Sequence, residues 1–315
     1  MEFLTRGTLD ADNILDGSNN KPGHNIWSKR YPRSALGDIL IWHEMAMRIF
    51  DVHFPSDHPH HATIRRVLED FSRRSVFYFT FMSSTEGGRE DLRNGHTPEE
   101  PIVPLDLFTE SALRQITYLR AQQYLRASVD IARFIACYTS IPVNTLYELV
   151  DQATHPMCVM DDLMEEIQDQ SNPDRYTDIQ MGEVNALSVY VMEHIDDLAQ
   201  QSTGYTSDDI RETMEKCFGT GNIDDARKIK ELYKGLDIVR HVGGQMLHSW
   251  VSFIEFERKE GQEIGFPPGL FANLFLHMVE YDVSGSKEIL EAVKTMKAAR
   301  LSSNEIVRNL MVNII

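Results

Sequence analysis

The sequence predicts an all-α protein of two helical lobes with an extended N-terminal arm. Apolar residues recur at a helical period through most of the chain, whereas the alternation typical of strands is scarce. The length of 315 residues exceeds the roughly 150 residues of a typical single domain. We therefore expect an arm over residues 1–33, an N-terminal helical lobe over residues 34–205 and a C-terminal helical lobe over residues 206–315.

The N-terminal third begins with a polar segment and continues into helices. The arm contains Gly and Pro and has no sustained apolar period, so we expect it to dock on a neighbour or stay mobile. From Leu36 the pattern turns helical, and the apolar residues within 64–71 keep that spacing. The sequence VFYFTF at 76–81 fits either a helix or a strand. Residues 84–108 are rich in Gly, Pro and charge, which predicts a long surface loop.

The strongest helix prediction lies in the middle of the chain. Thr109 is a suitable N-cap, and apolar residues occupy almost every side of the segment from Leu113 to Tyr138. A helix that is apolar all round is typically central and buried. Further helices are expected to start at Asn144 and at Met157, and another to run from Asp178 to about residue 200.

A hinge-like break, QSTGYTSDD at 201–209, marks the expected boundary between the lobes. Gly243 and Gly244 are expected to bend or split the longest helix that follows it. Ser302 and Glu305 form a capping-box pattern near the end of the chain. The helices expected after the break cover residues 206–218, 223–257, 268–281, 286–299 and 303–314.

Charge is distributed unevenly along the chain. The formal net charge is −17, and the segment 134–210 carries −14 of it because it holds fifteen Asp or Glu residues and one Arg. The remaining residues are almost balanced. The net charge alone therefore does not exclude an anionic partner such as nucleic acid.

Cysteine spacing and hydropathy indicate where the protein is found. The three cysteines are far apart and form no CxxC pair, which favours a reduced intracellular compartment over a disulfide framework or a cysteine-bound zinc. The N-terminus shows no secretory pattern, and no window is apolar enough to span a membrane. We expect a protein that is intracellular, not secreted, and without a membrane partner.

An acidic run, DDLMEEIQD at 161–169, is the first candidate for chemistry. On a helix, Asp161, Glu165 and Asp169 recur every four residues, with Asp162 and Glu166 beside them, and carboxylates so placed can bind Mg²⁺. The run resembles the second metal motif of class I terpene synthases, although Glu165 stands where that motif has Ser or Thr. The resemblance implies a Mg²⁺-dependent isoprenoid diphosphate lyase with Asp161, Glu165 and Asp169 as metal ligands. The competing interpretation is a solvated acidic helix face.

A group of four histidines, His53, His58, His60 and His61, is the second candidate. Two prolines interrupt the group, and it lacks the spacing of helix-borne metal ligands, so we expect a loop with titratable side chains. The sequence contains no GxSxG, P-loop or GxGxxG motif. These absences favour a function that is not enzymatic.

Basic residues on helix faces are the third candidate. Arg126 and Arg133 share one stripe of the central helix, and a buried arginine needs an anionic partner, either the acidic segment or a phosphate backbone. A second basic face lies opposite the apolar side of the helix expected from residue 223. The candidate RNA contacts are Arg114, Arg120, Arg126, Arg133, Arg227, Lys230 and Lys234.

The C-terminal part of the chain carries a further pattern. The dipeptide Phe266-Pro267 follows a helical segment and precedes a short apolar helix at 270–278 and an amphipathic helix at 289–299. This order resembles the C-terminal lobe of nucleoproteins of non-segmented negative-strand RNA viruses. The resemblance implies two helical lobes that clamp single-stranded RNA, and terminal arms that dock on neighbouring subunits.

We therefore interpret the sequence as a viral nucleoprotein without a cofactor. It would encapsidate single-stranded RNA in a basic cleft between its lobes, self-associate through its N-terminal arm, and reside in the virion or the host-cell interior. The first alternative is the Mg²⁺-dependent lyase described above. The second is a helical adaptor that binds only protein.

Overall fold

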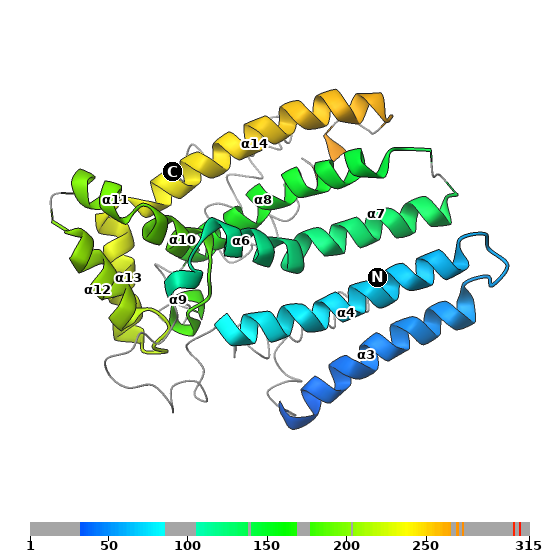
Figure 1. The fold of residues 1–315 in the computed structure, drawn as a ribbon, viewed down its shortest axis with the longest axis horizontal. Helices are drawn as coiled ribbons and strands as arrows, with labels where there is room; N and C mark the ends of the chain where they lie inside the picture. The colour runs from blue at the N-terminus through cyan, green and yellow to red at the C-terminus, as the bar shows by residue number, and fades with distance from the viewer. Residues whose placement is uncertain are drawn as a thin grey trace. The chain divides into compact units, whose positions relative to one another are not determined.

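A computed structural model of the chain describes residues 32–85, 105–137, 140–168, 177–202 and 204–265, with residues 269, 270, 273, 305 and 309. Every regular element in these ranges is a helix, so the predicted all-α class is confirmed (Figure 1). None of the described helices is both long and apolar enough to cross a membrane. The expected arm up to residue 31 and the pattern from Phe266-Pro267 to the C-terminal helices lie outside these ranges or touch only isolated residues of them.

The chain divides into two compact units that do not follow chain order. Unit 1 takes its residues from Met1–Ser84 and Tyr118–Leu146, and unit 2 from Thr85–Thr117 and Tyr147–Ile315. The boundary expected after residue 205 falls inside unit 2, between α11 (Ile195–Gln201) and α12 (Ser207–Cys217). These two helices contact each other.

Unit 1 is built on an antiparallel pair of helices, α3 (Pro32–His53) and α4 (His61–Thr85), which lie side by side (Figure 1). Its core joins three buried apolar residues of α4 to Ala127 of α7 (Gln123–Ile135). Phe50 and Phe54 at the end of α3 pack against this core. The ambiguous segment 76–81 is part of α4, because it continues the helix whose inward face is already buried. The buried α4 residues are Ile64, Leu68 and Phe71.

The predicted central helix is interrupted. Thr109 is its N-cap, since the Thr109 hydroxyl accepts a hydrogen bond from the Ala112 N–H at 3.2 Å. The segment then forms α6 (Glu110–Thr117), the π-helical turn η2 (Tyr118–Gln122) and α7. The π turn separates two helices that the uniform apolar pattern had joined, and it begins where the chain passes from unit 2 to unit 1.

Unit 2 differs from the expected helices in two places. One helix, α8 (Val143–Gln168), replaces the two expected from Asn144 and Met157, and it contains Pro156. The helix expected over 223–257 is divided into α13 (Ile223–Gly235) and α14 (Ile238–Glu263). The division falls at Asp237, which has a left-handed φ of 53°, and not at Gly243 or Gly244.

The helix expected from Asp178 to residue 200 is three short helices. They are α9 (Thr177–Met181), α10 (Ala186–Glu193) and α11. Asn185 explains the new start at α10, because it forms a capping box with Ser188: its side chain accepts from the Ser188 N–H at 3.0 Å, and the Ser188 hydroxyl accepts from the Asn185 N–H at 3.1 Å. The Asn185 side chain also donates to Asp178 at 3.3 Å.

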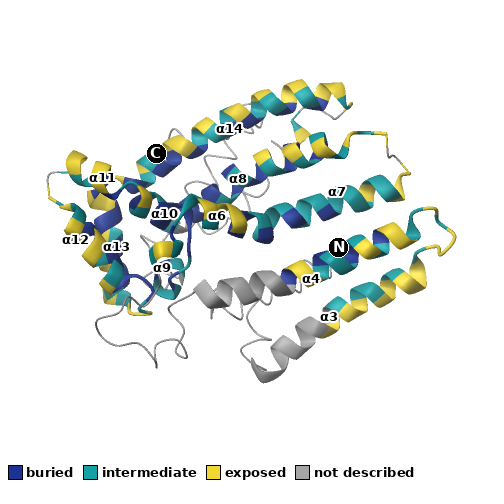
Figure 2. Cartoon of the chain, in the orientation of Figure 1, coloured by how far each residue is buried: buried dark blue, intermediate teal, exposed yellow. Residues whose placement is uncertain are grey.

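The centre of unit 2 is a helical core around α8, α13 and α14. Figure 2 shows α13 burying one face, which holds Ala226, Ile229, Leu232 and Tyr233. The ring of Phe108 meets that of Phe218 edge to face, with centroids 5.3 Å apart. The amphipathic prediction for α13 is therefore confirmed on its apolar side.

Replacing Asn185 with Ala tests the start of α10. The change removes the accepting side chain of a buried cap, so we expect the free energy of unfolding to fall by about 1 kcal/mol or somewhat more. Urea unfolding followed by circular dichroism measures the difference. Gln200→Ala, at an exposed position of α11, is the control, and equal stabilities of the two variants would contradict the capping role.

Candidate functional site

Residues 161–168 of the acidic run form the last two turns of α8 and carry acidic residues on two stripes of the helix. Because successive helix residues are about 100° apart, Asp162 and Glu166 share one stripe, and Asp161 and Glu165 share another about 100° away. The first stripe continues back along α8 through His155 and Val159. The structure therefore assigns different surroundings to carboxylates that are neighbours in sequence.

Asp162 connects α8 to α10. Its side chain is 6% exposed, and its Oδ2 accepts a hydrogen bond from the Ala186 N–H at 2.8 Å. Ala186 is the first residue of α10, whose early N–H groups have no partner within the helix and carry partial positive charge. Asp162 is thus engaged in holding the fold together.

Glu166 connects α8 to α13. Its Oε2 lies 3.5 Å from Nζ of Lys230, and both side chains are 15% exposed. The same ammonium group donates to the backbone carbonyl of Glu166 at 3.4 Å. A cation at this end of α8 also interacts favourably with the helix dipole. Lys230, which the sequence indicated as an RNA contact, is a partner of α8 instead.

Tyr233 lies one turn beyond Lys230 on the inner face of α13. Its side chain is 1% exposed, and its hydroxyl has no hydrogen-bond partner among the described residues. Burial raises its pKa well above the ordinary value, and the carboxylates of Glu166, Asp178 and Asp162 act in the same direction. Tyr233 is therefore a neutral phenol beside the acidic end of α8.

The second stripe holds the candidate metal ligands. Asp161 is half-buried, whereas the side chain of Glu165 and the whole of Asp169 lie outside the described residues. Among the described side chains, no three His, Cys, Asp or Glu residues are placed to hold a metal ion. Mg²⁺ is commonly bound by one or two carboxylates together with substrate phosphates and water, so Asp161 and Glu165 suit it in number and in donor type. The trio that includes Asp169 stays a prediction.

The predicted RNA contacts have partners within the chain where their contacts are described. Arg133 lies 3.3 Å from Asp130 and donates to the carbonyl of Ile141, and the guanidinium of Arg126 lies 5.5 Å from the centre of the Tyr118 ring. Aspartate one turn away and an aromatic ring therefore account for the two central arginines. Arg114 pairs with Glu110, Arg227 with Asp224, Arg120 is half-buried and Lys234 is exposed.

The predicted histidine loop connects α3 to α4. His53 ends α3, and His61 begins α4. His58 accepts from the His60 N–H at 3.1 Å, and its Nε2 lies 3.7 Å from Sγ of Cys137. Among the described residues, these histidines belong to no group of three His, Cys, Asp or Glu side chains placed to hold a metal ion.

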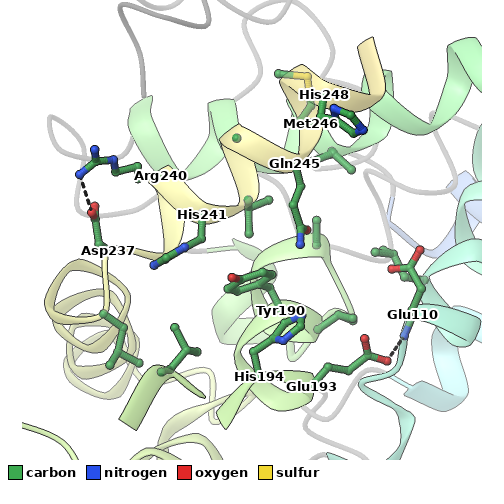
Figure 3. Close-up of a pocket in the computed structure, with 18 of the residues that line it drawn as sticks. Glu110, Tyr190, Glu193, His194, Asp237, Arg240, His241, Gln245, Met246 and His248 are labelled. Atoms are coloured by element: carbon green, nitrogen blue, oxygen red, sulfur yellow. Dashed lines mark hydrogen bonds and ion pairs between the residues drawn. The ribbon is translucent and has the colours of Figure 1, made fainter. Parts of the chain in front are cut away.

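A cavity of about 1080 Å³ opens in unit 2 between α6, α8, α10, α11 and α14. Figure 3 shows Tyr190 beside His194 and His241, whose ring centres lie 4.5 and 5.6 Å from that of Tyr190. Glu193 accepts from the Glu110 N–H at 2.7 Å across the same cavity. The sequence analysis missed this cavity, because its residues come from helices far apart in the chain and form no local motif.

His155 of α8 lines the cavity on the stripe that continues to Asp162. Burial lowers the pKa of this histidine, Arg114 lowers it further, and Glu110 acts in the opposite direction. The cavity and the candidate metal ligands are therefore on different stripes of α8.

Comparison with known proteins gives a result for the fold alone. No family profile and no curated protein matches the chain. Among solved structures, farnesyl diphosphate synthase from T. brucei in complex with risedronate has a TM-score of 0.64 and 18% identity, covering 91% of this chain and 77% of its own. The same enzyme, in a second structure, gives a TM-score of 0.60, 18% identity, and coverage of 89% and 74%. Its complex with homorisedronate gives 0.59, 18%, and 89% and 75%.

These similarities show that the chain shares the all-α fold of these farnesyl diphosphate synthase structures. The interpretation as a nucleoprotein that encapsidates single-stranded RNA is therefore wrong, and so is the RNA partner. The physical reason is that short amphipathic helices separated by an aromatic-Pro turn satisfy the packing rules of many all-α folds. Assembly through the arm was part of that interpretation and is withdrawn with it.

Replacing His155 with Gln tests the burial of this side chain. Because the folded-state pKa is below the ordinary 6.5, the unfolded chain binds the proton more readily, so stability is lost as pH falls through 6.5. We expect the variant to lose less stability than the natural chain between neutral and mildly acidic pH. Urea unfolding across that range measures this, with His248→Gln at an exposed cavity position as control. An unchanged pH dependence would contradict the burial of a neutral imidazole.

Proposed function

We propose that the chain binds an isoprenoid diphosphate together with Mg²⁺ and acts on the bond between the isoprenoid carbon and the diphosphate. The observation that supports this most is the similarity of fold to farnesyl diphosphate synthases over 91% of the chain. The second alternative of the sequence analysis, an adaptor that binds only protein, has no comparable support.

The acidic end of α8 is the part of the chain suited to this function. Asp161 and Glu165 lie four residues apart and offer hard oxygen donors on one stripe. When bound, Mg²⁺ neutralises the charge that develops on a departing diphosphate. Asp161 and Glu165 would hold the ion and orient the diphosphate, while Asp162 and Glu166 stay engaged with α10 and α13.

Two reactions are compatible with the proposed Mg²⁺-diphosphate site, and their organic products differ. A lyase releases diphosphate from one substrate, as the resemblance of residues 161–169 to class I terpene synthases implies. A synthase joins two isoprenoid units, as the names of the structural neighbours state for those proteins. Both reactions share the substrate class and the need for a positioned diphosphate.

The decisive experiment supplies the purified chain with Mg²⁺ and allylic isoprenoid diphosphates of increasing length, with and without isopentenyl diphosphate. Released diphosphate is measured enzymatically, and products are identified by gas chromatography and mass spectrometry. Release without isopentenyl diphosphate, with a hydrocarbon or alcohol product, indicates a lyase. A longer diphosphate formed only with isopentenyl diphosphate indicates a synthase. Failure to bind or convert any of these substrates would contradict the proposal.

Substituting both Asp161 and Glu165 with Ala should abolish binding of Mg²⁺ with diphosphate. For the natural chain, ligand at 100 times its dissociation constant adds about 2.7 kcal/mol of stability, which raises the melting temperature. We expect no such rise for the double variant, because the metal loses both protein carboxylates. Differential scanning fluorimetry with Mg²⁺ and inorganic diphosphate measures the shift.

The matched control changes Asp208 and Glu212 to Ala. These two exposed acidic residues are also four apart on one helix, α12. The control variant should retain the full ligand-induced shift. An equal loss in both double variants would mean that general negative charge, and not this stripe of α8, attracts the ion.

A further inference from the structure

The last turns of α8 are fixed by two buried contacts on one stripe. Glu166 meets Lys230 of α13 at 3.5 Å, and Asp162 accepts from the Ala186 N–H of α10 at 2.8 Å. Because a helix is stiff over such a short distance, fixing this stripe also fixes the backbone positions of residues 161 and 165 on the neighbouring stripe. A rotation of the end of α8 would move both stripes together.

We propose that Lys230 is a positioning residue for the Mg²⁺-diphosphate site: by holding Glu166, it sets the orientation of the helix turn that carries residues 161 and 165. The inference rests on the proposed function. In this proposal, Lys230 contacts neither the metal nor the substrate, but it changes the affinity for the metal. Residues that support metal ligands from behind commonly have such an effect.

The position of Lys230 makes it suited to this role. Glu166 is two residues from Gln168, the end of α8, where carbonyl groups lack partners within the helix. The Lys230 ammonium satisfies both the carboxylate and the backbone carbonyl of Glu166. Both side chains are mostly buried, so removing one charge leaves the other desolvated without this partner. Loss of the ammonium should therefore loosen or rotate the end of α8.

Other cations of α13 interact locally. Arg227 pairs with Asp224 at 2.8 Å, and Lys228 pairs with Asp225 at 2.7 Å, each with a residue three positions away on the same helix. Arg227 and Lys228 are more than half exposed, where ion pairs contribute little. The contact with Glu166 of α8 thus distinguishes Lys230 from these two neighbours.

The helix that carries Lys230, α13, is firmly packed. Ile229 and Leu232 on either side of it are 0% and 1% exposed, and the helix is capped by Asn222, whose side chain accepts from the Asp224 N–H at 2.8 Å. Because the backbone at Lys230 is already ordered by this helix, holding Glu166 costs only the rotamer freedom of the lysine side chain. Tyr233 lies on the buried face of α13, and its hydroxyl has no hydrogen-bond partner among the described residues, so it provides a control at a more deeply buried position of the same helix.

The test measures the Mg²⁺ concentration that gives half of the diphosphate-dependent rise in melting temperature. Lys230→Met keeps the apolar stem and removes the ammonium. We expect it to raise this concentration by about tenfold or more. Lys230→Arg, which keeps the charge, should restore most of the affinity. If Glu166 and Lys230 act as one unit, combining Glu166→Gln with Lys230→Met should cost little beyond either change alone.

Two matched controls separate positioning from general stability. Lys228→Met removes an exposed ammonium from the same helix, and Tyr233→Phe removes a buried hydroxyl next to Glu166. Both should leave the Mg²⁺ midpoint unchanged. An equal increase for Lys228→Met would overturn the proposal, because the effect would then depend on net charge alone.

The possible failures are distinguishable. If the natural chain shows no Mg²⁺-dependent shift with diphosphate, the proposed function itself fails. If the natural chain shows the shift and Lys230→Met melts at a lower temperature with the same Mg²⁺ midpoint, Lys230 is structural and the positioning role is overturned. If Lys230→Met does not fold, Glu166→Gln decides: a folded variant with an unchanged midpoint overturns the role, and a raised midpoint supports it.

Discussion

The buried carboxylates of α8 need hydrogen-bond donors or cations as partners. This requirement determines how the helices of unit 2 pack around the candidate site. A charged group removed from water is costly unless it is paired and hydrogen-bonded. Asp162 meets the requirement with the first amide of α10, and Glu166 with the ammonium of Lys230 on α13. Three helices are thereby joined at one end of α8. The fold consequently uses two acidic residues of the run, Asp162 and Glu166, for its own stability.

Local sequence signals predicted what depends on local interactions. The cap at Thr109 and the apolar face of α13 follow from side-chain chemistry and helical period, and both are present. The break at Asp237 was not predictable in the same way, because a left-handed aspartate carries no signal as strong as that of the glycine pair expected to split this helix. The spacing within residues 161–169 predicted carboxylates on a helix, and Asp161, Asp162 and Glu166 all lie on α8. It could not show which carboxylates are internal, since that depends on α10 and α13.

The function was harder to predict than the fold. The pattern around Phe266-Pro267 predicts amphipathic helices and turns, and such patterns specify packing without specifying chemistry. The acidic run at 161–169 carried chemical information. Glu165 departs from the metal motif of class I terpene synthases, however, and the longer pattern around Phe266-Pro267 favoured the nucleoprotein interpretation. The cavity around Tyr190 had no local sequence motif, because its rings come from α10 (Tyr190), from His194 between α10 and α11, and from α14 (His241). Chemistry-bearing residues on separate helices become recognisable only when tertiary packing brings them together.

The π turn at Tyr118–Gln122 has a consequence for comparing this chain with others of its fold. A π turn holds one residue more than an α turn over the same hydrogen-bonded loop, so the residues after it are shifted by one position relative to a regular helix. An alignment that permits no gap here would match Arg126 and Arg133 to the wrong positions in a relative whose helix is regular. At 18% identity, a one-residue offset is enough to hide the correspondence of a whole helix. The register of α7 is therefore better established from structure than from sequence.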